Sequence, residues 1–222
     1  MTHLRSRLLV LAFTTALLLG PIGRAPVVHA ASCPTGTATV VLDPGHGGAD
    51  PGASNAAFGL VEKELTLRVA QQAAAVLQGQ GITVALTRAD NATGLGNSAR
   101  GEIANACGAE VFVSIHFNSS TTAGVNDTKT FWGKKRKDLD FSRHLSGALA
   151  PALMPGTNLT NGGVGQFATG SLLQSTMPGT LAETVFLSNA EEAARLANSD
   201  GARVAQIANA IATGVSGWLA AH

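Results

Sequence analysis

The chain has 222 residues, a length that predicts a single domain. Its formal net charge is +1, and it becomes −2 without residues 1–30, because that segment holds three arginines and no acidic residue. Neither value supplies the basic surface that binds nucleic acid, so we expect no nucleic-acid partner. The one basic run, at 134–137, is more typical of a solvated loop than of a site for an anionic polymer.

The first 30 residues have the pattern of a secretory signal peptide. A short basic start is followed by an apolar run at 8–20 and by a small-residue exit that ends at Ala30. The run has 13 residues, whereas a membrane span needs roughly 20, so an uncleaved anchor is the weaker alternative. We expect cleavage near Ala30, a secreted, periplasmic or cell-wall location, and one catalytic domain over 31–222 with no stable membrane span.

Strands alternate with helices along the rest of the chain, which predicts a three-layer α/β domain with a mostly parallel sheet. Apolar, β-branched runs predict strands at 37–43, 82–87, 111–116, 128–132 and 180–187. Helical periodicity predicts helices at 61–79, 96–107 and 138–153, and two more in the alanine-rich stretch 190–220. Segments rich in Ser, Thr, Asn and Gly predict surface loops at 118–127 and 156–171.

His46 lies in a glycine-rich loop directly after the first predicted strand, in the sequence DPGHGG at 43–48. Ligands of open α/β sheets gather at the carboxyl ends of strands, and flanking glycines let the backbone approach closely. A phosphate-binding loop is the alternative, but it needs a following Lys and Ser or Thr, where this chain has Ala-Asp-Pro at 49–51. We therefore interpret His46 as a metal ligand.

Glu62 opens the predicted helix at 61–79 and lies three residues before Leu65, which begins the apolar stripe of that helix. This spacing places Glu62 on the inward face, whereas Glu64 groups with Arg68 on the polar face. A carboxylate that faces inward is costly unless it is paired or bound to a metal. The alternative is that Glu62 only favours the positive end of the helix.

His116 ends the third predicted strand, and Glu183 lies inside the apolar run at 181–187. A lone histidine at a strand end more often has a structural role than a ligand role. The presence of His46 and Glu62 makes a metal-ligand role the better interpretation of His116. Burial raises the pKa of a carboxyl group and suits it to proton transfer near neutral pH, so we interpret Glu183 as the catalytic residue. The alternative for Glu183 is a structural ion pair with Arg88 or Arg100.

Two histidines, one carboxylate and an open fourth position are typical of a catalytic zinc site. We therefore predict one zinc ion held by His46, Glu62 and His116, with zinc preferred over copper or iron on ligand chemistry. Zinc would activate water at neutral pH, and Glu183 would accept a proton and deliver it to the leaving group. The residues alone indicate a metal hydrolase.

Four stretches, in the same order, make the chain resemble the zinc-dependent N-acetylmuramoyl-L-alanine amidases, the bacterial cell-wall amidases. They are VVLDPGHGGADPGA (40–53), VEKELTLRVA (61–70), the segment 86–119 that ends after His116, and MPGTLAETVFLSNAEEA (177–193). The resemblance covers about 38–219. It implies hydrolysis of the amide between N-acetylmuramic acid and L-alanine in peptidoglycan.

The same resemblance implies a twisted, mostly parallel sheet of about six strands with helices on both faces. It also implies, more weakly, that Asn118 and Ser114 line the site and contact substrate. The region 118–176 follows the family pattern loosely. Its helix at 138–153 looks like a packing helix rather than a plug, so we expect an open site that is active without a partner protein.

Two other functions remain open at this point. One is a non-catalytic peptidoglycan-binding protein on the same fold, and the presence of all four site residues disfavours it. The other is a zinc peptidase that acts on another amide, because the metal chemistry is shared. For the amidase we expect a monomer whose only partner is peptidoglycan.

Cys33 and Cys107 are the two cysteines of the chain. They lie too far apart in sequence to indicate a zinc site, and export makes a disulfide possible. Each precedes a strand, so both belong to the amino-terminal edge of a parallel sheet. If those strands are neighbours, we expect a disulfide on the side of the sheet away from the metal.

Overall fold

The computed structural model describes residues 33, 36–122 and 124–222. The predicted signal peptide at 1–30 lies outside these residues. The strands are β1 (Val40–Pro44), β2 (Ser54–Asn55), β3 (Leu60–Val61), β4 (Val84–Leu86), β5 (Val111–Asn118), β6 (Asp127–Trp132), β7 (Thr160–Gln166) and β8 (Gly179–Phe186). The α-helices are α1 (Glu62–Gly79), α2 (Asn97–Ala106), α3 (Arg136–Leu153), α4 (Gly170–Gln174), α5 (Ala190–Ala197) and α6 (Ala202–Ala221).

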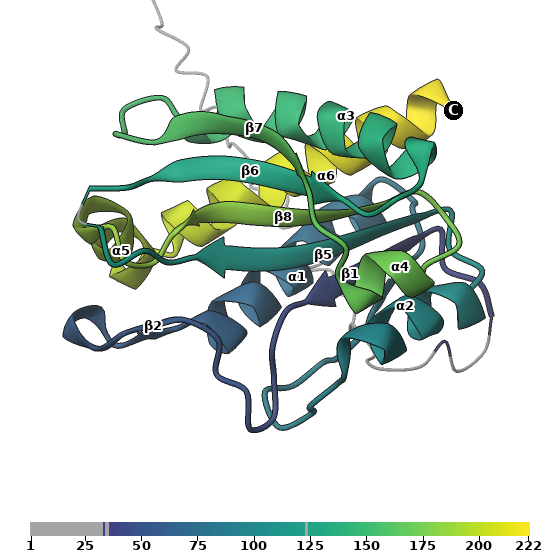
Figure 1. Ribbon diagram of the computed structural model, residues 1–222, viewed down its shortest axis with the longest axis horizontal. Helices are drawn as coiled ribbons and strands as arrows, with labels where there is room; N and C mark the ends of the chain where they lie inside the picture. Colours follow the sequence, from purple (N-terminus) through teal and green to yellow (C-terminus); the bar gives the residue numbers. More distant parts are fainter. Residues whose placement is uncertain (1–32, 34–35, 123) are drawn as a thin grey trace, which may run out of the picture.

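Six of the strands form one sheet in the order β4-β1-β5-β8-β6-β7 (Figure 1). β4, β1, β5 and β8 run parallel to one another. β6 pairs antiparallel with β8 and parallel with β7, so these last two strands run in the opposite direction. The prediction of a mostly parallel sheet of about six strands is confirmed. The carboxyl ends of β1, β5 and β8 meet at one edge.

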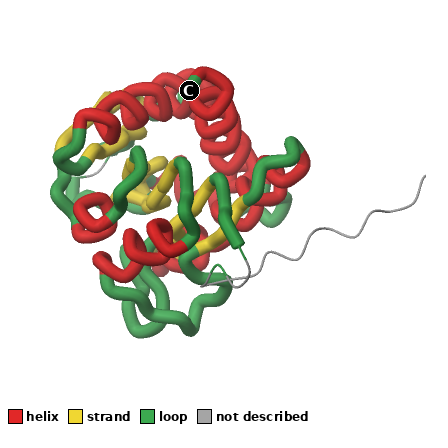
Figure 2. Tube along the Cα trace, turned by 90° about the vertical axis from the view of Figure 1, so that its right-hand side faces the viewer, coloured by secondary structure: helices red, strands yellow, loops and turns green. Residues whose placement is uncertain are grey.

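Side-chain alternation along the strands divides the core between the two faces of the sheet. Val40 and Leu42 belong to the larger apolar cluster, which α1, α3 and α6 cover, whereas Val41 belongs to a smaller cluster with Leu172 of α4. Figure 2, turned by 90°, shows helices on both sides of the strands. The fold therefore has the predicted three layers, with α2 and α4 on the face that matters for the site below.

The predicted packing role of the helix at 138–153 is confirmed by α3. Phe141, Leu145 and Leu149 are fully buried in the larger cluster, on the face opposite α2 and α4. Among the described residues, α6 alone is long and apolar enough to cross a membrane, but half of its most apolar window is buried inside the protein. This burial is typical of a core helix.

The segment 156–171 is not the surface loop that its composition predicts. It contains β7 and the start of α4. The error has a physical cause, because β7 is an edge strand of sequence TNGGVGQ whose side chains are all exposed or half-buried. Such a strand has no apolar alternation, and its glycines are depleted in strands generally. The strand is instead fixed by its hydrogen-bonded pairing with β6, which the local sequence does not reveal.

The basic run at 134–137 is only partly a solvated loop. Lys135 Nζ donates hydrogen bonds to the carbonyl oxygens of Leu172, Ser175 and Met177, and it lies 3.4 Å from Asp138 Oδ1. Lys135 therefore joins the start of α3 to the segment around α4, which explains one lysine of the run by structure alone.

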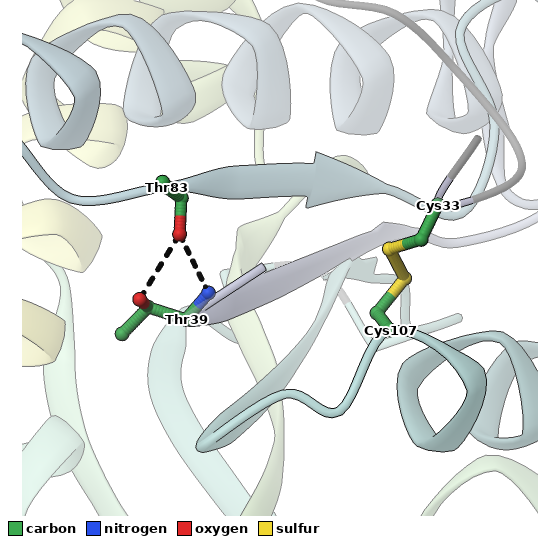
Figure 3. The surroundings of a disulfide bond; sticks show 4 residues. All are labelled: Cys33, Thr39, Thr83 and Cys107. Atoms are coloured by element: carbon green, nitrogen blue, oxygen red, sulfur yellow. Dashed lines mark hydrogen bonds between the residues drawn. A yellow bond between two sulfur atoms is a disulfide. The ribbon is translucent and has the colours of Figure 1, made fainter. Parts of the chain in front are cut away.

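Cys33 and Cys107 form a disulfide, with their Cα atoms 5.2 Å apart (Figure 3). β1 and β5 are neighbours in the sheet, as the predicted pairing required. Thr39 beside them bonds Thr83 at the same edge, through its backbone N–H to Oγ1 and through its hydroxyl (Figure 3). The disulfide thus closes the amino-terminal edge of the sheet, away from His46 and His116.

Reducing this disulfide is expected to lower the free energy of unfolding by about 4 kcal/mol, because the bond closes a long loop in the unfolded chain. Urea unfolding with and without dithiothreitol measures the change. The double variant Cys33→Ser, Cys107→Ser is the control, and its stability should not respond to the reductant. Two free thiols in the purified exported protein would contradict the bond.

Candidate active site

The carboxyl edge of the sheet brings together the four residues that the sequence singled out. His46 is the second residue after β1, His116 lies near the end of β5, and Glu183 lies in β8 in register with His116. Glu62 is the first residue of α1. The strand ends and one helix start therefore deliver four side chains to one place, as the parallel order of β1, β5 and β8 requires.

Glu62 lies between the two histidines. Its Oε1 is 3.0 Å from His46 Nε2 and 3.1 Å from His116 Nδ1. The backbone N–H groups of Phe117 and Ala53 donate hydrogen bonds to its two carboxylate oxygens. Burial raises the pKa of Glu62, but the contacts with the two histidines outweigh it and hold that pKa at about 2. Glu62 is thus a fixed, ionised carboxylate, and Glu64 is exposed as predicted.

Two glycines make this convergence possible. A side chain at Gly45 would place its Cβ 2.3 Å from the His116 ring, and one at Gly52 would lie 2.6 Å from Glu62 Oε2. His46 itself adopts a left-handed backbone with φ 63°, which costs energy for a non-glycine residue. The loop after β1 therefore places His46 beside Glu62 at the cost of a strained backbone at His46. It also requires glycine at positions 45 and 52, where a side chain would clash.

The three side chains fit a metal ion. One nitrogen or oxygen from each of His46, Glu62 and His116 lies within 4.8 Å of the others. Two imidazoles and a carboxylate are a donor set that zinc accepts in catalytic sites. The carboxylates of Glu62 and Asp50 raise the pKa of His46 even though burial lowers it. A cation that binds here would displace the protons that the imidazoles otherwise share with Glu62.

Asp50 orients His46, and the sequence reasoning missed it. Its Oδ2 lies 2.8 Å from His46 Nδ1, and a carboxylate can only accept, so Nδ1 donates and Nε2 is left for a metal. Gly52 N–H donates to the other oxygen of Asp50. Asp50 lies four residues after His46 in the same loop, and this spacing could have identified it. In the sequence it served only as an argument against a phosphate-binding loop.

A buried network below the pocket holds the loop after β1. Asp43 is fully buried and accepts hydrogen bonds from Arg100 Nη1 at 2.7 Å and from Ser114 Oγ at 2.6 Å. Arg88 donates to the carbonyl oxygens of Pro44 and Gly45. Both arginines are therefore engaged around the His46 loop rather than paired with Glu183, which removes the structural ion pair proposed for that residue.

The structure places the two weaker candidates outside the metal cluster. Ser114 is 1% exposed and its hydroxyl is bonded to Asp43, so it lies beneath the site. Asn118 lies past His116 at the end of β5, and its side-chain oxygen accepts from Ser119 N–H. Neither lines the pocket that contains the other four residues.

Glu183 lines this pocket. Its Oε2 is shielded from solvent and has no hydrogen-bond partner among the described residues. Burial raises the pKa of Glu183 to about 7, and the nearby charge of His116 offsets only part of that effect. A carboxyl group in this state can both accept and deliver a proton near neutral pH.

The raised pKa of Glu183 predicts how the stability of the metal-free protein depends on pH. The folded chain retains a proton that an ordinary carboxyl of pKa 4.5 has released, so this contribution to stability is full below about pH 4.5 and is lost as pH rises to about 7. The loss amounts to about 3 kcal/mol. Glu183→Gln should therefore be more stable than the wild type at about pH 8 and similar at about pH 4, as measured by urea unfolding. A constant difference between the two proteins would contradict the raised pKa.

The pocket has a volume of about 280 Å³. Besides His46, Glu62, His116 and Glu183, its lining includes Asp50 from the loop after β1, Asn97 and Arg100 from α2, and Phe167 and Thr169 from the segment between β7 and α4. Among the described residues, α3 contributes none of the lining. The arrangement is a cleft with the carboxyl group of Glu183 beside a cluster of side chains that could hold a metal ion.

The comparisons with known proteins agree with this geometry. Residues 40–217 match the model of the family described as N-acetylmuramoyl-L-alanine amidase. The chain is 32% identical to the N-acetylmuramoyl-L-alanine amidase LytC of Bacillus subtilis over 158 residues, which is 71% of this chain and 31% of LytC. It is 35% identical to the probable cell wall amidase LytH of Staphylococcus saprophyticus over 153 residues, which is 68% of this chain and 48% of LytH. The chain thus spans less than half the length of these two relatives.

This chain matches nearly the full length of two solved structures. The amidase AmiC2 of Nostoc punctiforme is 31% identical, with a TM-score of 0.73 over 83% of this chain and 99% of that one. The catalytic domain of the amidase CwlV from Paenibacillus polymyxa is 34% identical, with a TM-score of 0.73 over 81% of this chain and 97% of that one. Both matches cover more than four fifths of this chain.

Proposed function

Because the chain belongs to the N-acetylmuramoyl-L-alanine amidase family, we propose that it hydrolyses the amide bond between N-acetylmuramic acid and L-alanine in peptidoglycan. One zinc ion, held by His46, Glu62 and His116, serves as its cofactor. The observation that carries this proposal is the convergence of those three side chains in the pocket that also contains Glu183. A non-catalytic binding protein has no need of such a constellation.

The roles of the residues follow from their surroundings. Zinc, when bound, polarises the amide carbonyl and makes water a nucleophile at neutral pH. Glu183 accepts the proton of the attacking water on its unpaired oxygen and later delivers a proton to the alanine nitrogen as the amide bond breaks. Asp50 keeps the tautomer of His46 fixed, and the Asp43–Arg100 pair holds the strained loop that carries His46.

The location and state of the protein follow from the same proposal. A wall amidase acts outside the cytoplasmic membrane, which agrees with the signal-peptide pattern of 1–30 and with a disulfide that forms in oxidising compartments. Since α3 packs on the far face of the sheet, the pocket carries no plug from that helix. We therefore propose that the protein is active as a monomer without an activating partner.

Digestion of purified peptidoglycan followed by mass spectrometry of the products tests the proposed function. The expected result is stem peptides with a free L-alanine amino terminus and glycan strands that keep their lactyl groups. Addition of a zinc chelator should abolish the release, and zinc should restore it. Cuts within the stem peptide would favour a zinc peptidase instead, and binding without any cut would favour a wall-binding protein. Dependence on a second protein would contradict activity without a partner.

A further inference from the structure

A lysine is paired in register with Glu183 and forms no ion pair with any other residue that the structure describes. Lys129 of β6 is in register with Glu183 of β8, which is itself in register with His116 of β5. Residues paired in this way have side chains on the same face of a sheet. The three therefore form a row across the sheet on the α2 and α4 side, where Phe131 also packs against the smaller apolar cluster.

The ammonium group of Lys129 is held by aromatic contact instead of by a carboxylate. Its Nζ lies 5.4 Å from the centre of the Phe131 ring, within the range of a cation–π interaction. Among the residues that the structure describes, Lys129 makes no ion pair within 4.0 Å. In contrast, the cation Arg100 in the pocket wall is neutralised by Asp43. Lys129 is thus half-buried with its charge available.

The neighbouring strand leaves room for this arrangement. A side chain at Gly165 of β7 would place its Cβ 2.8 Å from the Phe131 ring and 3.1 Å from Lys129 Cε. Gly165 does not have a left-handed backbone conformation, so the backbone does not require glycine there. Its lack of a side chain instead leaves room for Phe131 and Lys129. Phe167, two residues later, is 54% exposed, contacts Phe131 with ring centres 6.0 Å apart, and lines the pocket.

We propose that Lys129, together with the Phe131–Phe167 pair, binds a carboxylate of the stem peptide beyond the L-alanine. This inference rests on the proposed function. Adjacent strands lie about 4.8 Å apart, and an extended peptide advances about 3.5 Å per residue. A peptide that leaves Glu183 along this direction therefore presents its second residue to Lys129. The exposed face of Phe167 supplies an apolar wall for the same segment, and the glycan extends from the opposite side of the scissile bond.

The test uses two synthetic N-acetylmuramoyl tripeptides that differ only in a carboxylate or a carboxamide on the second peptide residue. The zinc-loaded wild type should prefer the carboxylate by about 10-fold or more in kcat/KM, since a charge-assisted hydrogen bond is lost with the amide. Lys129→Met, which keeps the stem over Phe131, should bring this ratio close to 1. Lys129→Arg should restore the preference. Lys134→Met, at an exposed lysine in the segment between β6 and α3, should keep the wild-type ratio.

Two outcomes would overturn the proposal. One is a wild-type ratio near 1. The other is an equal loss on both substrates in Lys129→Met with an unchanged unfolding temperature, because a structural or general electrostatic role does not distinguish the two peptides. A different result would contradict the proposed function: the zinc-loaded wild type would cleave neither tripeptide and would also leave peptidoglycan intact. The failure of this inference can therefore be distinguished from the failure of the proposed function.

Discussion

Glu183→Gln is expected to lower kcat for the release of stem peptides by about 10²- to 10⁴-fold, the range for loss of a general acid–base residue. Glutamine has nearly the same size and can donate or accept hydrogen bonds, but it cannot take a proton from water and pass it on. The variant should keep its metal, because Glu183 is not one of the three clustered side chains. Turnover and zinc content are measured on the same preparation.

Glu110→Gln provides the matched control, since Glu110 is exposed and lies before β5, at the other edge of the sheet. It should show wild-type turnover. If Glu183→Gln loses its zinc together with its activity, Glu183 is a ligand and its catalytic role is wrong. If turnover falls by less than about 10-fold, another group moves the proton.

Glu62→Gln is expected to remove the metal itself. The carboxylate of Glu62 supplies the negative charge between His46 and His116 and is held by two backbone N–H groups. A neutral amide offers a weaker oxygen ligand in the same position. Even outer-shell changes typically weaken metal binding by 10–100-fold, so zinc affinity should fall by more than about 100-fold.

Glu64→Gln, two residues along the same helix, is the control for this variant, because Glu64 is exposed. Zinc affinity is measured by competition with a chelator, and circular dichroism shows whether each variant folds. High concentrations of zinc should partly restore the activity of Glu62→Gln. Wild-type zinc affinity in this variant would show that the metal lies elsewhere.

The sequence grouped four side chains that the structure brings to one edge of the sheet, but it did not reveal their neighbours in the pocket. Glu62 could be separated from Glu64 because an apolar helical stripe has a fixed direction, and His46 and His116 could be grouped because parallel strands end at one edge. Asp50 and Phe167 could not be predicted in this way. They lie in irregular segments, where no period relates a position to a direction.

The sheet shows the same division. β1, β5 and β8 are buried on both faces, and their apolar runs were legible in the sequence. β7 is an exposed edge strand whose place is fixed by its pairing with β6. Gly165 of β7 leaves room for Lys129 and Phe131. The proposed peptide subsite therefore depends on the strand that the sequence did not predict.

The central claim is that one zinc ion binds among His46, Glu62 and His116. Anomalous scattering at the zinc edge, collected from crystals of the Glu183→Gln variant, tests it most directly. The account predicts one strong peak within coordination distance of all three side chains, with the position that faces residue 183 left for water or substrate. Absence of a peak there in crystals grown with zinc, or a single strong peak elsewhere in the protein, would contradict it.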